Sequence, residues 1–160
     1  MFDTTKRILS KIGRYVSVDS VSVEQTTDYC GNPVELITIS KDVNVGFEAA
    51  EESVIFYFFS DHVHFDDFSV ELEGDEPNFL ARAESFVDDL FTLPIHRRYS
   101  RKGTRVVSDQ SWFVQKSGKE ESIAGVTLCG PGWKNLFKPK ERFDELWQFN
   151  ADTKQWQRIR

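Results

Sequence analysis

The sequence predicts a single α+β domain over 1–160, with a largely antiparallel sheet, an N-terminal helix and one long amphipathic helix near 77–93. Three observations predict this class. The first two are that short β-prone segments recur between turn residues and that two other segments have apolar residues at helical spacing. The third is composition. With 39% hydrophobic residues, including 14 Phe, the 160-residue chain can fill one core and does not resemble a disordered segment.

The first predicted element is a short helix. Thr4 or Thr5 is a suitable N-cap for it, and Gly13 weakens its end. Its apolar residues recur at helical spacing: Ile8, Leu9, Ile12, Tyr15 and Val16. The chain therefore begins with an amphipathic segment and lacks the long apolar run of a signal peptide there, so we expect a cytoplasmic protein.

Several strands are predicted next. A turn at 30–33 separates an alternating segment from the β-prone residues 34–40, which predicts a hairpin, and 43–47 alternates again. The run 53–59 is apolar on both faces, so we expect a central strand that is covered on both sides. After this run, apolar residues occupy alternate positions, and at 66–67 the alternation shifts by one position. The sheet is therefore expected to bend there.

The clearest helix is predicted over 77–93. Pro77 suits the first turn, the acidic residues 75–76 suit the positive end of the helix dipole, and Pro94 ends the helix. The apolar residues again recur at helical spacing: Phe79, Leu80, Ala83, Phe86, Val87, Leu90 and Phe91. We expect this stripe to pack on the sheet.

A second β region is predicted after this helix. We expect strands at 105–107, 111–115 and 122–129, separated by turns at 108–110 and 117–119. Two more elements are then expected, namely a short helix within 133–143 that is interrupted at Pro139, and a hairpin within 145–160.

Charge is segregated along the chain. From Glu48 to Asp89 there are 13 Asp and Glu against the single basic residue Arg82, whereas from Arg97 to Arg160 there are 14 Lys and Arg against 7 acidic residues. Interspersed charges would be enough for solubility, so this segregation favours an acidic surface for a positively charged partner.

Local rules are broken at the end of the long helix. Asp88 and Asp89 lie where the helix dipole disfavours negative charge, and Glu84 lies one turn before Asp88 on the side away from the apolar stripe. Such exceptions tend to occur at functional sites. The predicted partner-binding residues are Asp61, Asp66, Asp67, Glu71, Glu73, Glu84, Asp88 and Asp89.

No motif in the sequence predicts catalysis or a cofactor. Phosphate-binding, dinucleotide-binding, nucleophile-elbow and zincin motifs are absent from the sequence. Cys30 and Cys129 are far apart without a C-x-x-C spacing, and nothing local orients Cys129 toward His96. We therefore expect a non-enzymatic protein with two free thiols.

A metal site remains an alternative. His62, His64 and Asp66 are two positions apart, so they would lie on the same face of a strand, and a divalent metal can bind residues with this spacing. The only other histidine, His96, lies beyond a helix, so we expect a solvated face and no bound metal. A small metal-binding enzyme that uses these three residues is the alternative left open.

A basic run follows the long helix, and it includes one aromatic residue. We expect it to be a solvated loop, although pairing with the acidic segment within the fold stays open. The pI of about 5.1 opposes nucleic-acid binding, and no apolar run approaches the length of a membrane span, so neither partner is expected. The run consists of Arg97, Arg98, Tyr99, Arg101, Lys102 and Arg105.

A compact acidic α+β chain that is rich in aromatic residues and has no catalytic motif is similar to bacterial immunity proteins. Proteins of that class neutralise a cognate toxin, often a cationic nuclease, by covering its active surface with carboxylates. The resemblance implies a stoichiometric inhibitor that binds a basic protein partner through its acidic surface. A generic interaction module for a basic partner is the other alternative left open.

Overall fold

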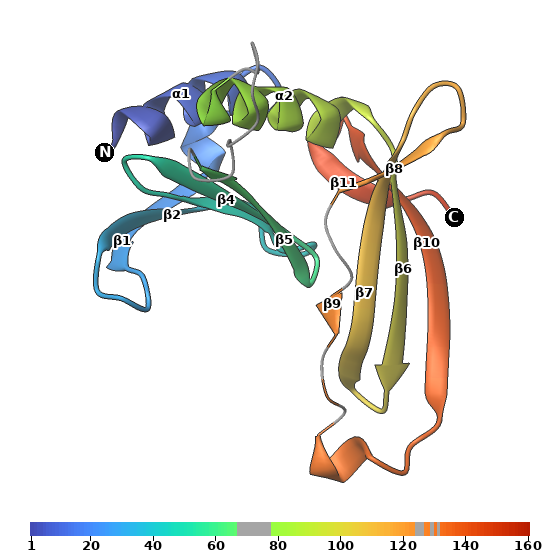
Figure 1. The fold of residues 1–160 in the computed structure, drawn as a ribbon. Helices are drawn as coiled ribbons and strands as arrows, with labels where there is room; N and C mark the ends of the chain where they lie inside the picture. Colours follow the sequence, from blue (N-terminus) through green and yellow to red (C-terminus); the bar gives the residue numbers. More distant parts are fainter. Residues whose placement is uncertain (67–77, 124–126, 129, 131) are drawn as a thin grey trace. The chain divides into compact units, whose positions relative to one another are not determined.

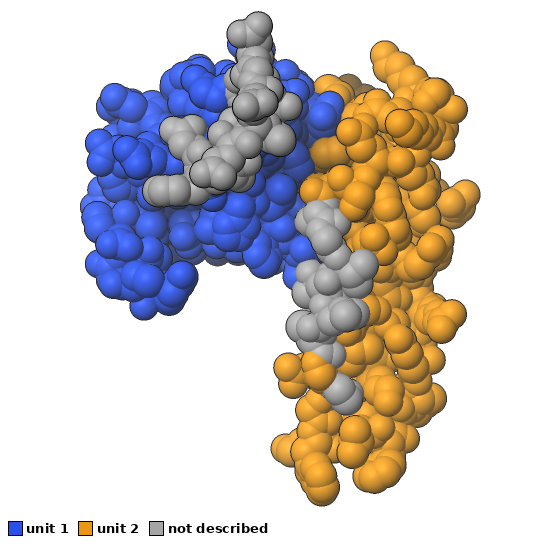
Figure 2. All heavy atoms as spheres, in the orientation of Figure 1, with its two compact units in different colours: residues 1–91 blue, residues 92–160 orange. Residues whose placement is uncertain are grey.

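The computed structural model describes residues 1–66, 78–123, 127–128, 130 and 132–160 (Figure 1). The described residues form two α-helices and two antiparallel sheets, which confirms the predicted α+β class. Contacts divide the chain into two compact units, Met1–Phe91 and Thr92–Arg160, drawn in blue and orange in Figure 2. A single domain over the whole chain stays a prediction.

The first unit is an antiparallel sheet of five described strands with two helices on one face (Figure 1). Its strands lie in chain order and are β1 (Ser22–Thr27), β2 (Pro33–Ser40), β3 (Val45–Ala49), β4 (Ser53–Phe58) and β5 (Asp61–Asp66). Its helical elements are α1 (Asp3–Ile12), the short 3₁₀ helix η1 (Val18–Ser20) and α2 (Phe79–Thr92). The predicted hairpin on either side of the turn at 30–33 is therefore confirmed as β1 and β2.

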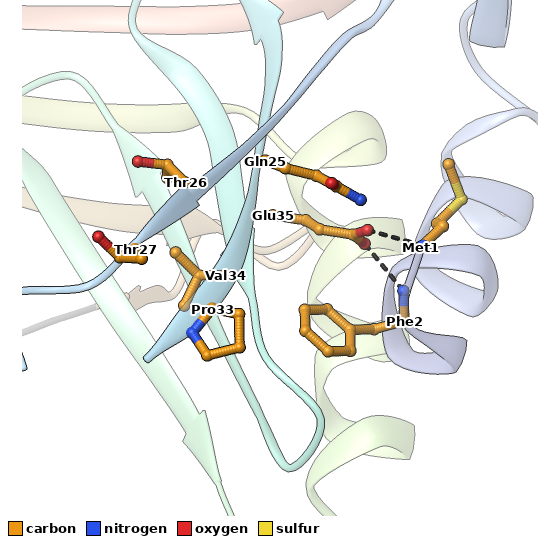
Figure 3. A pocket seen from close by; sticks show the side chains of 8 residues that line it. All are labelled: Met1, Phe2, Gln25, Thr26, Thr27, Pro33, Val34 and Glu35. Atoms are coloured by element: carbon orange, nitrogen blue, oxygen red, sulfur yellow. Dashed lines mark hydrogen bonds and ion pairs between the residues drawn. The ribbon is translucent and has the colours of Figure 1, made fainter. Parts of the chain in front are cut away.

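The start of α1 differs from the prediction. Thr4 and Thr5 are buried within the helix, and Phe2 occupies the N-cap position. The backbone N–H of Phe2 donates to the carboxylate of Glu35 at 2.9 Å, and the amino group of Met1 lies 3.0 Å from the same carboxylate (Figure 3). A buried side chain of β2 therefore replaces the threonine cap, which local sequence cannot reveal.

Strand β4 also differs from the prediction. Val54, Phe56 and Phe58 are buried against the helices, whereas Ile55 and Tyr57 are only half-buried on the other face. The strand pairs with β3 and β5, so β3 is the middle strand of the described sheet. The apolar run predicted burial on both faces, but one of its faces is partly open. The predicted bend at 66–67 extends beyond the described residues.

Helix α2 confirms the predicted stripe. It ends at Thr92, just before Pro94, and every residue of the stripe except the half-buried Leu80 is buried. Asn78 lies at its start, and its side-chain oxygen accepts a hydrogen bond from the backbone N–H of Ala81 at 2.9 Å. The predicted first-turn residue Pro77 and the acidic residues 75–76 lie outside the described residues.

The second unit is a six-stranded antiparallel sheet in the order β11-β10-β6-β7-β8, with β9 also pairing with β7. Its strands are β6 (Ile95–Lys102), β7 (Arg105–Val114), β8 (Glu120–Ser122), β9 (Thr127–Leu128), β10 (Lys140–Asn150) and β11 (Gln155–Arg158). The predicted tail hairpin is confirmed as β10 and β11.

Two predictions for this unit are wrong. The basic run lies mostly on β6 and is not a loop, and 108–110 lies inside β7 and is not a turn. The short helix predicted within 133–143 is present as the 3₁₀ helix η3 (Trp133–Asn135), and the end of that range is the start of β10. The turn at 108–110 was predicted because polar residues interrupt the apolar alternation of β7, where Asp109 and Ser111 are buried.

Neither described α-helix is long and apolar enough to cross a bilayer.

Candidate partner-binding site

The acidic face of α2 lies beside cations from α1. Arg7 places Nη2 2.7 Å from Oε1 of Glu84, and Lys11 places Nζ 2.5 Å from Oδ2 of Asp88. The hydroxyl of Tyr15 also donates to Asp88 at 2.7 Å. The cations that neutralise this face therefore come from a helix more than 70 residues earlier in the chain.

The titration of these groups reflects the same contacts. Burial alone would raise the pKa of Asp88, but the hydrogen bonds from Lys11 and Tyr15 outweigh it and lower that pKa. Burial, together with the Asp88 carboxylate, raises the pKa of Tyr15 to about 12. Asp88 is thus an ionised structural partner of α1, which reduces the negative charge it offers to another molecule.

The other predicted acidic residues have different positions. Asp61 is buried on the inward face of β5, where its carboxylate accepts the backbone N–H of His62 at 2.9 Å, so it does not form part of the surface. Asp89 is half-buried on α2, and Asp66 is half-buried at the end of β5. Asp67, Glu71 and Glu73 lie outside the described residues.

Turns at one end of the five-stranded sheet enclose a hollow of about 600 Å³. The strand register places the β1–β2 turn, the β3–β4 turn and the end of β5 at the same end, since Thr27 pairs with Pro33, Ala49 with Val54 and Ser53 with Asp66. Four carboxylates from these segments line the hollow: Asp28, Glu51, Glu52 and Asp66. Three of them are absent from the residues predicted by sequence.

A second hollow, of about 300 Å³, adjoins the first on the sheet face away from the helices, and the two share Asp28, Ala50 and Ser53. It adds one carboxylate, Glu48, together with Tyr29, Tyr57 and both adjacent histidines. We call the two hollows together the acidic hollow, with five lining carboxylates: Asp28, Glu48, Glu51, Glu52 and Asp66.

The chain itself holds the two main turns of the acidic hollow in place. The hydroxyl of Thr4 donates to the backbone oxygen of Glu51 at 2.8 Å, which ties the β3–β4 turn to α1. The carboxylate of Asp28 accepts the backbone N–H groups of Cys30 and Asn32, both at 2.8 Å, which closes the β1–β2 turn. The site is therefore largely formed before any partner binds.

Its carboxylates are well suited to cations. Hydrogen bonds from Asn32 lower the pKa of Asp28, so this group is ionised at neutral pH. Glu51 and Glu52 are exposed, and the described part of the chain gives neither of them an ion pair. Burial, helped by the Glu48 carboxylate, raises the pKa of Tyr57 to about 12, so its hydroxyl stays neutral.

The histidines predicted as possible metal ligands line the second of the two hollows. His62 and His64 are exposed on one face of β5, with ring centroids 5.0 Å apart. Among the described residues, no group of three or more His, Cys, Asp or Glu side chains is placed to hold a metal ion. The third histidine, His96, contacts Glu120 at 2.6 Å and Asp144 within the second unit.

A neighbouring hollow of about 530 Å³ lies where the start of the chain meets β1 and β2 (Figure 3). Met1, Phe2, Gln25 and Val34 line it, and its one carboxylate is Glu35. Because that carboxylate already binds the amino group of Met1 and the N–H of Phe2, it is less available to an outside cation than those of the acidic hollow.

The basic run of the second unit is largely neutralised by its own sheet. Arg97 forms a buried pair with Asp109 on β7, with Nη2 and Oδ2 2.6 Å apart. On β10, Asp144 pairs with Arg98 at 3.0 Å and Glu141 pairs with Arg101 at 2.9 Å. The acids that pair with this run therefore come from adjacent strands of the same unit.

Comparisons with known proteins identify no relative: no family model matches the chain, and neither the curated proteins nor the solved structures contain a significant match. The geometry of the described residues is therefore the basis for a functional proposal.

Proposed function

We propose that the protein is a stoichiometric protein-binding inhibitor of the immunity type, which binds a basic segment of a cognate toxin in the acidic hollow. The observation that supports the proposal is the convergence of five carboxylates on two adjoining hollows, one at an end of the five-stranded sheet and the other along its face away from the helices. Tyr29, whose side chain is 99% exposed at the rim, adds an aromatic anchor.

The lining of the acidic hollow matches Lys and Arg side chains of a partner. A carboxylate pair such as Glu51 and Glu52 accepts the hydrogen bonds of a guanidinium or ammonium group, and Tyr29 offers a ring face to the same cations. Each exposed ion pair contributes only about 0–1 kcal/mol, so stable binding also needs aromatic contacts that exclude water.

Charge at the scale of the whole unit supports the same proposal. Residues 1–91 contain 19 Asp and Glu against 6 Lys and Arg. Such an excess attracts a cationic partner over distances comparable to the Debye length, and steered association reaches about 10⁸–10⁹ M⁻¹s⁻¹ at low salt.

A co-expression experiment tests the function. A host that expresses the gene next to this one in its source genome is expected to grow poorly, and this protein is expected to restore growth and to co-purify with that gene product. Glu51→Lys with Glu52→Lys should weaken both effects. Asp19→Lys with Asp42→Lys is the control, because it makes the same change in charge at exposed acidic residues that do not line the acidic hollow.

Three outcomes are decisive. Rescue and co-purification that are lost only in the Glu51/Glu52 variant support an inhibitor that acts through the acidic hollow. A complex with a harmless neighbour would favour a general interaction module for basic proteins. If the neighbouring gene is harmless and no complex forms, the immunity role is contradicted.

A further inference from the structure

One end of the second unit is built from two segments that pack together. The β6–β7 turn meets the segment before β10, where the ammonium group of Lys102 donates to the backbone oxygen of Leu136 at 3.3 Å (Figure 1). At Gly103, where φ is +57°, a Cβ atom would lie only 2.5 Å from Oδ1 of Asn135. We call residues 102–105 and 132–140 the basic tip.

The basic tip has charges of one sign. It contains five cations and no acidic residue: Lys102, Arg105, Lys134, Lys138 and Lys140. By contrast, Arg97, Arg98 and Arg101 of β6 all have carboxylate partners. Within the described part of the chain, none of the five cations of the tip forms an ion pair. Their charge is therefore available to an anionic partner.

The same tip also exposes large apolar side chains. Trp133 is 86% exposed, Phe137 is 92% exposed and Leu136 is 42% exposed. Single exposed apolar residues are common on protein surfaces, but three within five positions and next to unpaired cations indicate an interaction site. Because these side chains project from the tip, their partner must be a surface that they can enter.

We propose that the basic tip docks on an anionic phospholipid membrane. Trp133, Leu136 and Phe137 would enter the boundary between headgroups and acyl chains, where Trp is enriched in membrane proteins, while the lysines contact lipid phosphates. The sequence-based expectation of no membrane partner rests on the lack of a spanning segment, and peripheral docking needs none. This proposal depends on the second unit alone and not on the acidic hollow.

Two observations favour lipid over other anionic partners. Single-stranded nucleic acid is bound by aromatic platforms along a groove, but Leu136 has no ring to stack on a base and the side chains of the tip project outward. Protein interfaces are depleted in Lys, whereas four of the five cations of the tip are lysines. Lysine side chains near an anionic membrane each add to the affinity.

Vesicle co-sedimentation of the full chain tests the proposal. The protein should bind vesicles that contain phosphatidylcholine and phosphatidylserine. Its affinity for vesicles of phosphatidylcholine alone should be lower by roughly tenfold or more. Trp133→Ala with Phe137→Ala, and separately Lys134→Glu with Lys138→Glu, should each lower the affinity by about tenfold or more. The matched controls are Val18→Ala with Val23→Ala and Lys116→Glu with Lys119→Glu, which change exposed residues elsewhere and should bind normally.

The remaining outcomes overturn the proposal. Equal binding to both vesicle types would show that charge is irrelevant, and loss in the lysine variant without loss in the aromatic variant would leave only non-specific attraction. Binding to an oligothymidylate or to polyglutamate, but not to vesicles, would assign the tip to nucleic acid or to an acidic protein. Unchanged circular dichroism and thermal unfolding of each variant show that the fold is intact.

Discussion

The two compact units carry opposite charge and use it differently. Residues 1–91 contain 13 more acidic than basic residues, whereas residues 92–160 contain 7 more basic than acidic residues. In the first unit the carboxylates of α2 pair with α1, and those of the turns gather at the acidic hollow. In the second unit the arginines of β6 pair with neighbouring strands, whereas the lysines of the tip form no ion pair with any described residue. Charge segregation along the chain thus corresponds to two proposed interaction surfaces, one in each unit.

The units also differ in what holds them together, and the largest expected effect tests this difference. Phe56 in the first unit is fully buried among the rings of Phe47, Phe65 and Phe86, with centroids 4.9–5.9 Å away. Phe56→Ala should lower the free energy of unfolding by about 3–5 kcal/mol in chemical denaturation. Phe143→Ala, which removes a half-exposed ring stacked on Tyr99 in the second unit, should cost far less. Equal losses would contradict this contrast.

The buried ion pair of the second unit is expected to have the next largest effect. Asp109 is fully buried against Arg97, so Asp109→Ala leaves a mostly buried guanidinium without its carboxylate. The expected loss is about 3–5 kcal/mol in the free energy of unfolding. Glu141→Ala, which breaks the exposed pair with Arg101, is the matched control and should cost about 0–1 kcal/mol. A loss below about 1 kcal/mol for Asp109→Ala would show that the pair is not desolvated.

The pairs between α1 and α2 should have smaller effects. Arg7→Ala removes a solvent-exposed ion pair and Lys11→Ala removes a partly buried one. Each should lower the free energy of unfolding by about 1 kcal/mol or less. Lys6→Ala, which affects only the exposed pair with Asp3, is the control. Because Asp88 then loses its partner, Lys11→Ala should also raise the pKa of Asp88, which NMR titration of the carboxyl group measures.

The smallest effect concerns pH. Hydrogen bonding to His96, and to Arg98, lowers the pKa of Asp144 below its ordinary value of 3.8. A lowered carboxyl pKa stabilises the fold at pH values above the unfolded value, and this contribution is lost as pH falls through the folded value. Asp144→Asn should therefore lose less stability than the wild type as the pH falls from about 5 to about 2, whereas the exposed control Asp152→Asn should follow the wild type. Parallel curves for all three would exclude this contribution.

The spacing of apolar and turn residues predicted the elements in which one face is apolar and buried. Helix α2 and the two predicted hairpins follow from spacing and turn residues, so they appear where expected. Strand β6 was not predicted because its charged residues pair across strands. Strand β7 was predicted as two strands with a turn between them, because Asp109 and Ser111 are polar residues that are buried. Patterns of hydrophobicity do not detect a buried carboxylate that pairs with a side chain of another strand, as Asp109 pairs with Arg97.

The site was predictable only in part. The sequence located an acidic region, and Asp66 does line the acidic hollow. Asp28, Glu51 and Glu52 were missed because they are turn residues brought together by strand register. Conversely, Glu84 and Asp88 have no basic partner close to them in the sequence, because the cations that pair with them come from α1. The charge of a surface depends on tertiary contacts that charge counts cannot supply.

The most direct test of the central claim is the rate at which the co-purified partner associates with the protein, measured by stopped-flow mixing at low and high salt. If the acidic hollow binds the partner, Glu51→Lys with Glu52→Lys should slow association at low salt by about tenfold or more and flatten its salt dependence, well beyond the effect of Asp19→Lys with Asp42→Lys. Equal effects of the two charge-matched variants would mean that net charge, and not the acidic hollow, governs binding.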